Sequence, residues 1–123
     1  MFGAALEHHP GDPTFLHLLA AVGGKNTATA PRGYVTALFD GVAPQFERHL
    51  VHELDYRVPE ALADLVRPML EAVRQDAGRA GAPARAIDLG CGTGLVGIAL
   101  AGSGARIVGV DLSPRMLEIA ATR

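Results

Sequence analysis

The stretch AIDLGCGTGLVGIAL, residues 86–100, joins an apolar run to a glycine-rich turn. The run ends in Asp88 and predicts a buried strand over residues 84–89. Glycine then occupies every second position, as Gly90, Gly92 and Gly94. Glycine reaches backbone angles that other residues avoid, and it has no side chain to hold a ligand away from the main chain. The stretch therefore predicts a tight turn that can approach a ligand closely.

The residues after this turn continue as a strand–helix–strand pattern. Residues 95–101 suit a helix, and RIVGV at 106–110 predicts a second strand. Ser113 is a good N-cap, and Pro114 at the first helical position begins another helix. A strand, a turn, a helix and a strand in this order form a βαβ unit, in which ligands bind at the carboxyl ends of the strands.

The glycine turn is consistent with two kinds of cofactor. Gly92 begins the pattern G-x-G-x-x-G, which satisfies the dinucleotide fingerprint, and Asp111 lies 21 residues after Gly90, where an acid can accept both hydroxyls of a ribose. Asp88, however, precedes the first glycine and would repel a pyrophosphate, whereas it would attract the amino group of a methionine-like ligand. The residues alone also allow a turn that serves packing only.

The motifs DLGCGTG (residues 88–94) and GVDLS (residues 109–113) resemble those of class I S-adenosylmethionine-dependent methyltransferases. The resemblance implies a Rossmann-like α/β fold preceded by α-helices, of which this chain holds the first βαβ unit, and S-adenosylmethionine as cofactor. By position in the motifs, the resemblance implies that Asp88 lies near the methionyl amino group of the cofactor and that Gly90, Cys91, Gly92 and Gly94 lie along its methionyl and ribose part. It also implies that Asp111 binds the ribose hydroxyls and that Leu112 and Met116 lie at the adenine. Cys91 is interpreted as a small filler and not as a nucleophile. No catalytic residue and no methyl acceptor follow from the motifs.

Apolar residues upstream recur at helical spacing in two stripes. The first comprises Ala43, Phe46, Leu50 and Leu54, and the second comprises Leu62, Leu65, Val66, Met69, Leu70 and Val73. Pro68 lies inside the second stripe, which predicts a kink or two shorter helices that meet there. Gly78 and Gly81 are expected to end this helical region.

The sequence of residues 34–66 resembles the segment that precedes the methyltransferase domain in tetratricopeptide-repeat-linked methyltransferases. The resemblance implies helices that cover the cofactor site, with Tyr34 and Phe39 helping to close it. Phe2, Ala5 and Pro10 have the spacing of a tetratricopeptide unit, which would give the chain a protein partner. The expected regions are a repeat remnant (1–22), a Gly/Pro-bearing linker (23–33), a helical segment (34–82) and the start of the methyltransferase domain (83–123).

The overall composition sets further bounds. The chain has 123 residues and a formal net charge of −2, from 13 acidic and 11 basic residues without a basic stripe, so nothing indicates nucleic-acid binding. Cys91 is the single cysteine, which predicts a reducing, cytoplasmic location, and no apolar run has the length of a membrane span. His49 and His52 match neither of the zinc-protease helix motifs, so no metal site is expected.

Two strands are fewer than the seven of a complete class I methyltransferase, so we expect this chain to be a fragment of a longer protein. The first strand should then have an open edge and an uncovered apolar face, and the isolated chain should bind cofactor weakly and tend to self-associate. Two alternatives to methyl transfer remain, namely a non-catalytic, repeat-linked interaction module and an NAD-binding Rossmann protein.

Overall fold

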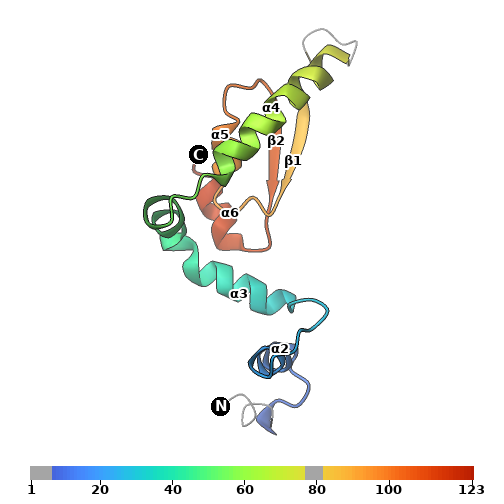
Figure 1. The fold of residues 1–123 in the computed structure, drawn as a ribbon, viewed down its shortest axis with the longest axis vertical. Helices are drawn as coiled ribbons and strands as arrows, with labels where there is room; N and C mark the ends of the chain where they lie inside the picture. Colours follow the sequence, from blue (N-terminus) through green and yellow to red (C-terminus); the bar gives the residue numbers. More distant parts are fainter. Residues whose placement is uncertain (1–6, 77–81) are drawn as a thin grey trace. The chain divides into compact units, whose positions relative to one another are not determined.

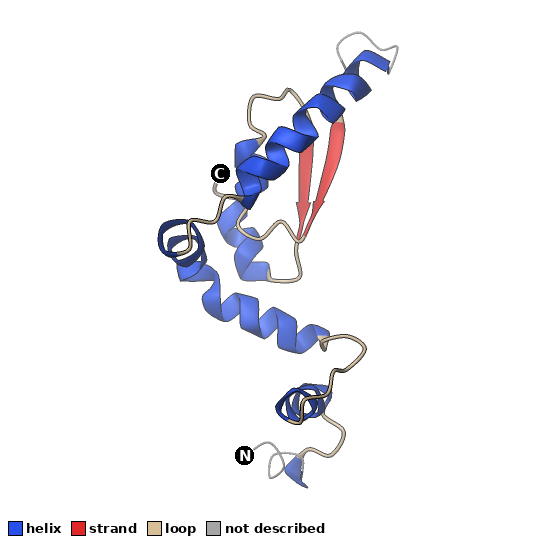
Figure 2. Cartoon of the chain, viewed as in Figure 1, coloured by secondary structure: helices blue, strands red, loops and turns tan. Residues whose placement is uncertain are grey.

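The computed structural model describes residues 7–76 and 82–123, except for the side chains of His52 and Asp76. The chain divides into two compact units between residues 38 and 39. Figure 1 shows the fold, and Figure 2 distinguishes its helices from its strands. Gly78 and Gly81, which were expected to end the helical region, lie outside the described residues.

The first unit, up to Leu38, contains helix α2 (Pro13–Val22) and the beginning of helix α3 (Arg32–Val42). Asp12 caps α2, because its Oδ1 accepts a hydrogen bond from the backbone N–H of Thr14 at 2.8 Å. The predicted linker is irregular between the two helices, and α3 begins two residues before the boundary predicted at residue 34. Phe2 and Ala5 lie outside the described residues, so the repeat remnant stays a prediction.

The second unit, residues 39–123, holds the remaining elements. In chain order they are the 3-10 helix η1 (Ala43–Gln45), the π-helix η2 (Arg48–Glu53), α4 (Val58–Asp76), β1 (Arg85–Leu89), α5 (Leu95–Ala99), β2 (Arg106–Val110) and α6 (Pro114–Ala120). The strands pair in parallel, with Arg85 opposite Arg106 and Leu89 opposite Val110. The predicted strand–helix–strand order is therefore confirmed, although α5 ends at Ala99 and not at residue 101.

One face of this sheet packs against helices. The buried core consists of Ala63, Leu70, Ala84 and Leu100. Ala86 of β1 and Ile107 of β2 pack against these residues from the sheet. The guanidinium of Arg67 donates a hydrogen bond to the carbonyl oxygen of Ala99, which joins α4 to α5. The helices thus pack against the amino-terminal part of β1, the strand from which the glycine turn continues.

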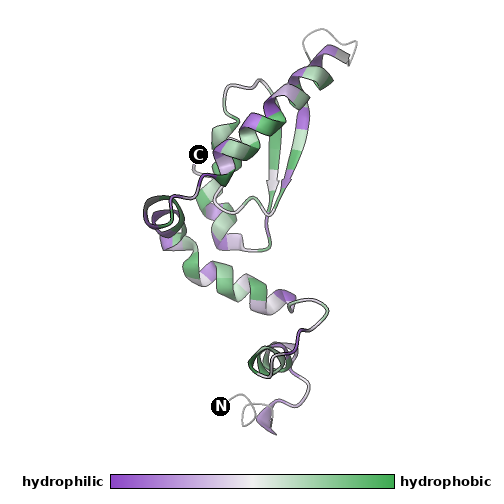
Figure 3. Cartoon of the chain, in the orientation of Figure 1, coloured by the Kyte–Doolittle hydropathy of each residue, from purple (hydrophilic) through white to green (hydrophobic). Residues whose placement is uncertain are grey.

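The opposite face of the sheet is exposed in the described structure. Ile87 is 69% exposed and Leu89 is 80% exposed, and on the neighbouring strand Val108 and Val110 are 44% and 48% exposed. Figure 3 shows the hydrophobic residues of both strands. The expected uncovered apolar face is therefore present among the described residues.

Helix α4 is one continuous helix of 19 residues with Pro68 inside it. Of the two predicted alternatives at Pro68, the division into two shorter helices is wrong, and the kink stays a prediction. Proline lacks the N–H that would donate to the carbonyl oxygen of Asp64, four residues earlier. Asp64 and Pro68 both lie on the exposed side of the helix, so water can satisfy that oxygen and the helix continues.

The predicted apolar stripe of α4 is buried only in part. Leu70 is 6% exposed, and Ala63, which the stripe did not include, is 1% exposed. Leu65 and Met69 are 71% and 65% exposed, because α5 and the sheet lie against the other side of the helix. Within the described part of the chain, no helix combines the length and the apolar character needed to cross a membrane.

The first predicted stripe also fails in part. Residues 43–53 do not form a regular α-helix, because a tight 3-10 turn and a wide π-helix occupy most of them. These two geometries change the angle between successive residues, so the spacing of 3.6 residues per turn no longer aligns the stripe. Ala43 is 3% exposed, whereas Leu54 at the other end of the stripe is 60% exposed.

Candidate functional site

The glycine turn lies where both strands end. Gly90, Gly92 and Gly94 have φ angles of 79°, 53° and 85°, in the left-handed region that favours glycine. The backbone N–H groups of Gly90 and Cys91 both donate to the carbonyl oxygen of Val110, at 2.7 and 3.1 Å. The turn is therefore tied to the end of β2 and needs glycine for its backbone angles.

Asp111 connects this turn to the start of α6. Its Oδ2 accepts a hydrogen bond from the backbone N–H of Gly92 at 2.8 Å, and its Oδ1 accepts one from the N–H of Ser113 at 2.8 Å. Ser113 caps α6, because its Oγ accepts from the N–H of Met116 at 3.1 Å. The structure thus brings the predicted ribose acid into contact with the predicted glycine turn, 19 residues apart in sequence.

Asp88 lies at the end of β1 and is half-buried. Burial raises the pKa of its carboxyl above the ordinary value, and the negative charge of Asp111 raises this pKa further. The two carboxyl groups are therefore close enough to repel each other. Such a pair favours a ligand that brings positive charge and disfavours one that brings a pyrophosphate.

Cys91 is buried, with 8% of its surface exposed. Burial raises the pKa of its thiol, and the charges of Asp88 and Asp111 raise it further. Its side chain fills the space above Gly109, because a Cβ atom on Gly109 would lie 2.7 Å from the Cys91 sulfur. A thiol with a raised pKa is a poor nucleophile at neutral pH, which favours the interpretation of Cys91 as a filler.

The two residues predicted at the adenine differ in exposure. Leu112 is 45% exposed next to Asp111. Met116 is 1% exposed and is among the most buried side chains of the described structure. Met116 can therefore meet a ligand only if a neighbouring group moves away from it, and its cofactor contact stays a prediction.

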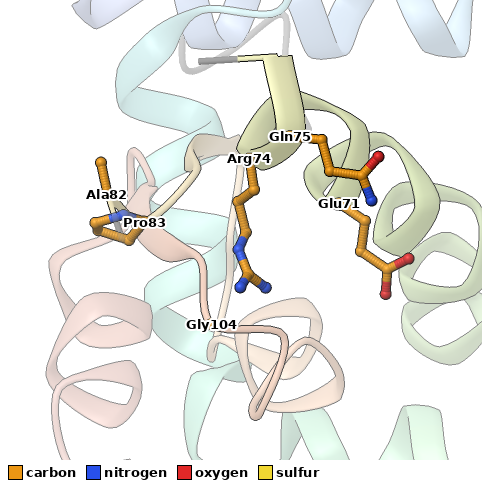
Figure 4. Close-up of a pocket in the computed structure, with 6 residues that line it drawn as sticks. All are labelled: Glu71, Arg74, Gln75, Ala82, Pro83 and Gly104. Atoms are coloured by element: carbon orange, nitrogen blue, oxygen red, sulfur yellow. The ribbon is translucent and has the colours of Figure 1, made fainter. Parts of the chain in front are cut away.

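Three of the predicted residues line one cavity of about 560 Å³, namely Asp88, Cys91 and Gly94. A second cavity of about 430 Å³ includes Thr93, whose buried hydroxyl has no hydrogen-bond partner among the described residues. The pocket drawn in Figure 4, of about 340 Å³, is lined by Arg74, Pro83 and Gly104 among others. Pro83 and Gly104 precede the two strands, so this pocket lies at the end of the sheet opposite the glycine turn and contains none of the predicted residues.

The segment just upstream of α4 also reaches the turn. A Cβ atom on Gly92 would lie 3.8 Å from the Phe46 ring, and Phe39 contacts that ring edge-on with centroids 6.5 Å apart. Tyr34 belongs to the first unit, where its ring lies 5.3 Å from the ring of His17. Phe46 is therefore the aromatic residue next to the turn, which the sequence interpretation had not assigned to this role.

Asp40 is a second residue that the sequence interpretation left without a role. Its Oδ1 accepts a hydrogen bond from the hydroxyl of Ser113 at 2.5 Å and one from the backbone N–H of Arg115 at 3.3 Å. Asp40 and Ser113 are 73 residues apart, so no local pattern could have paired them.

His49, one of the two histidines compared with metal-binding motifs, contacts a carboxylate four residues further along the chain. Nδ1 of His49 lies 2.7 Å from Oε2 of Glu53, and both side chains are more than half exposed. Among the described residues, no group of three or more His, Cys, Asp or Glu side chains is placed to hold a metal ion.

Comparison with known proteins adds an independent observation. Residues 86–123 match the methyltransferase domain family. The chain is also 51% identical over 39 residues to the magnesium-protoporphyrin O-methyltransferase of Rhodobacter capsulatus, a stretch that covers 32% of this chain and 17% of that protein. No solved structure matches the chain significantly. Both matches support a class I methyltransferase, and the parallel strands with their helices fit the start of a Rossmann-like α/β fold.

Proposed function

We propose that residues 83–123 form the cofactor-binding start of an S-adenosylmethionine-dependent methyltransferase, with Asp111 as the acceptor of the ribose hydroxyls. The contact between Asp111 and Gly92 carries this proposal, because it joins the two predicted motifs in one site within the range that matches the methyltransferase domain family. Each oxygen of Asp111 accepts one backbone N–H, so each keeps a further lone pair for a hydroxyl. Two neighbouring hydroxyls of a ribose suit this arrangement.

The charges around the turn support the same cofactor. S-adenosylmethionine carries a positive sulfonium and an ammonium group, and the carboxyl groups of Asp88 and Asp111 would attract both. The cofactor supplies the methyl group, while the chain's own residues bind and orient it. Gly90, Gly92 and Gly94 have no side chains of their own that would hold the cofactor away from the main chain. Leu112 is exposed beside Asp111.

The packing around the glycines disfavours the alternative of an NAD-binding Rossmann protein. In the dinucleotide fingerprint the third glycine allows the helix to pack closely on the strand. Here that position is Gly97, and a Cβ atom on it would meet no atom within 4 Å in the described part of the chain. The close approach occurs at Gly94, where a Cβ atom would lie 3.4 Å from the Cβ of Ala120.

Calorimetric titration of the 123-residue chain with S-adenosylmethionine and with NAD tests the proposal. We expect weak binding of S-adenosylmethionine to the wild type and a loss of about tenfold or more in affinity for Asp111→Ala, because hydrogen bonds to a charged group are removed. Asp64→Ala, which removes an exposed acid on α4, is the matched control and should bind like the wild type. Binding of NAD alone would favour the dehydrogenase alternative, and binding of neither ligand would favour the interaction module.

A further inference from the structure

Asp40 reaches the site from outside the matched domain. It lies near the end of α3, in the second unit, and its carboxylate accepts hydrogen bonds from the Ser113 hydroxyl and the Arg115 N–H. Ser113 is 0% exposed, so its hydroxyl is shielded from solvent and Asp40 is the partner to which it donates. A hydrogen bond from a hydroxyl to a carboxylate is of the stronger, charge-assisted kind.

The contacts of Ser113 extend this bond toward the turn. Because its hydroxyl proton points to Asp40, the lone pairs of its Oγ are free to accept from the N–H of Met116. Its backbone N–H donates to Oδ1 of Asp111, and the other oxygen of Asp111 accepts from Gly92. A continuous path of hydrogen bonds therefore runs from Asp40 through Ser113 and Asp111 to the glycine turn.

We infer that Asp40 is a positioning residue that holds the Asp111 carboxylate in the orientation in which it receives the ribose of the cofactor. This inference rests on the proposed function. Asp40 fixes Ser113 at the start of α6, and the N–H of Ser113 then fixes the plane of the Asp111 carboxylate. A group that is held before its ligand arrives loses less conformational freedom on binding, so the affinity is higher. The segment that contains Asp40 thus contributes to cofactor affinity without touching the cofactor.

Titration with S-adenosylhomocysteine, which carries the same ribose and no transferable methyl group, tests the inference in five variants. We expect Asp40→Ala to weaken binding by about five- to tenfold, because it removes the acceptor at the beginning of the path. Asp40→Asn retains an acceptor oxygen and should lose less than about twofold. Asp40→Glu keeps the charge but displaces the oxygens by one methylene, so its loss should approach that of Asp40→Ala. Asp111→Asn removes the charge of the acid that receives the ribose. When Asp40→Ala is added to this variant, the affinity for S-adenosylhomocysteine should fall by less than about a further twofold.

An equal loss from Asp40→Ala with and without the Asp111 substitution would overturn the inference, because Asp40 would then act independently of Asp111. Wild-type affinity in Asp40→Glu would overturn it as well, since charge alone would suffice. Asp40→Glu and Asp40→Asn keep the test decisive if Asp40→Ala does not fold.

Amide hydrogen exchange of the ligand-free chain separates this inference from the proposed function. In Asp40→Glu and Asp40→Ala, we expect the N–H groups of Ser113 and Gly92 to exchange faster than in the wild type. The N–H of Ile98, which donates to the carbonyl oxygen of Gly94 at the start of α5, should keep its rate and reports any general loss of structure. A wild type that binds no S-adenosylhomocysteine would contradict the proposed function only, whereas unchanged exchange at Ser113 and Gly92 would contradict the positioning role of Asp40.

Discussion

The two faces of the β1–β2 sheet carry different kinds of residue. On the face that packs against α4 and α5, Ala86 pairs with Ile107 in the core, and Asp88 pairs with Gly109 beneath Cys91 at the site. On the opposite face, Ile87 pairs with Val108 and Leu89 with Val110, and all four side chains are exposed. Parallel sheets are commonly buried on both faces. Among the described residues, the covered face therefore holds both the core and the candidate site residues Asp88 and Cys91, whereas the opposite face presents apolar side chains to solvent.

The largest expected effect is a loss of core packing on the covered face. Leu100, at the end of α5, is 4% exposed. We expect Leu100→Ala to lower the free energy of unfolding by about 2–5 kcal/mol, through lost burial and a remaining cavity. Urea unfolding followed by circular dichroism measures this value. Val110→Ala on the opposite face is the matched control and should lose less than about 1 kcal/mol, so equal losses would remove the distinction between the faces.

A smaller effect is expected where the site meets the sheet. A Cβ atom on Gly109 would lie 2.7 Å from the sulfur and 3.0 Å from the Cβ of Cys91. Gly109→Ala should therefore lower the free energy of unfolding by about 1–3 kcal/mol through overpacking. Removal of the sulfur by Cys91→Ala in the same chain should restore part of this loss, which urea unfolding of the four chains would reveal. Additive losses in the double variant would show that the two side chains do not compete for the same space.

The next effect depends on pH and concerns Asp88. The pKa of its carboxyl is raised in the folded chain, so the folded state favours the protonated form. The contribution of this carboxyl to stability should therefore be lost as the pH rises from below the ordinary value of 3.8 through the raised pKa. Asp88→Asn, which carries no charge, should melt at a higher temperature than the wild type at neutral pH and at a similar temperature near about pH 3. A lower melting temperature of the variant at neutral pH would contradict the assigned direction.

The smallest change in stability is expected on the exposed face. Ile87→Thr and Val108→Thr should each change the free energy of unfolding by no more than about 0.5 kcal/mol, because these side chains are in contact with water. The same substitutions should weaken self-association by reducing the exposed apolar surface, as measured by sedimentation velocity over a range of concentrations. Ser103→Ala, at a polar loop position, is a control that should leave self-association unchanged. A large loss of stability would show that the face is covered in solution.

Local signals explain most of what the sequence predicted. The glycines after β1 and the Ser113–Pro114 start of α6 act within a few residues, and the structure has both features where they were predicted. The contact between Asp111 and Gly92 could be predicted from the sequence because a βαβ unit brings the ends of its strands together. Asp40 and Gly109 were missed because their partners are set by packing, which spacing along one chain does not encode. The apolar stripe of α4 was only partly right for the same reason, since spacing identifies apolar residues but not the side that a neighbour covers.

Pro68 also limits what can cover the outer side of α4. The carbonyl oxygen of Asp64 receives no N–H from Pro68, so it depends on water or on another donor. Leu65 and Met69 lie directly after these two residues and are exposed. A surface that buried Leu65 and Met69 would therefore have to stop short of this oxygen or bring a donor to it. The need to hydrate this one backbone oxygen thus limits how far a covering surface could extend over Leu65 and Met69.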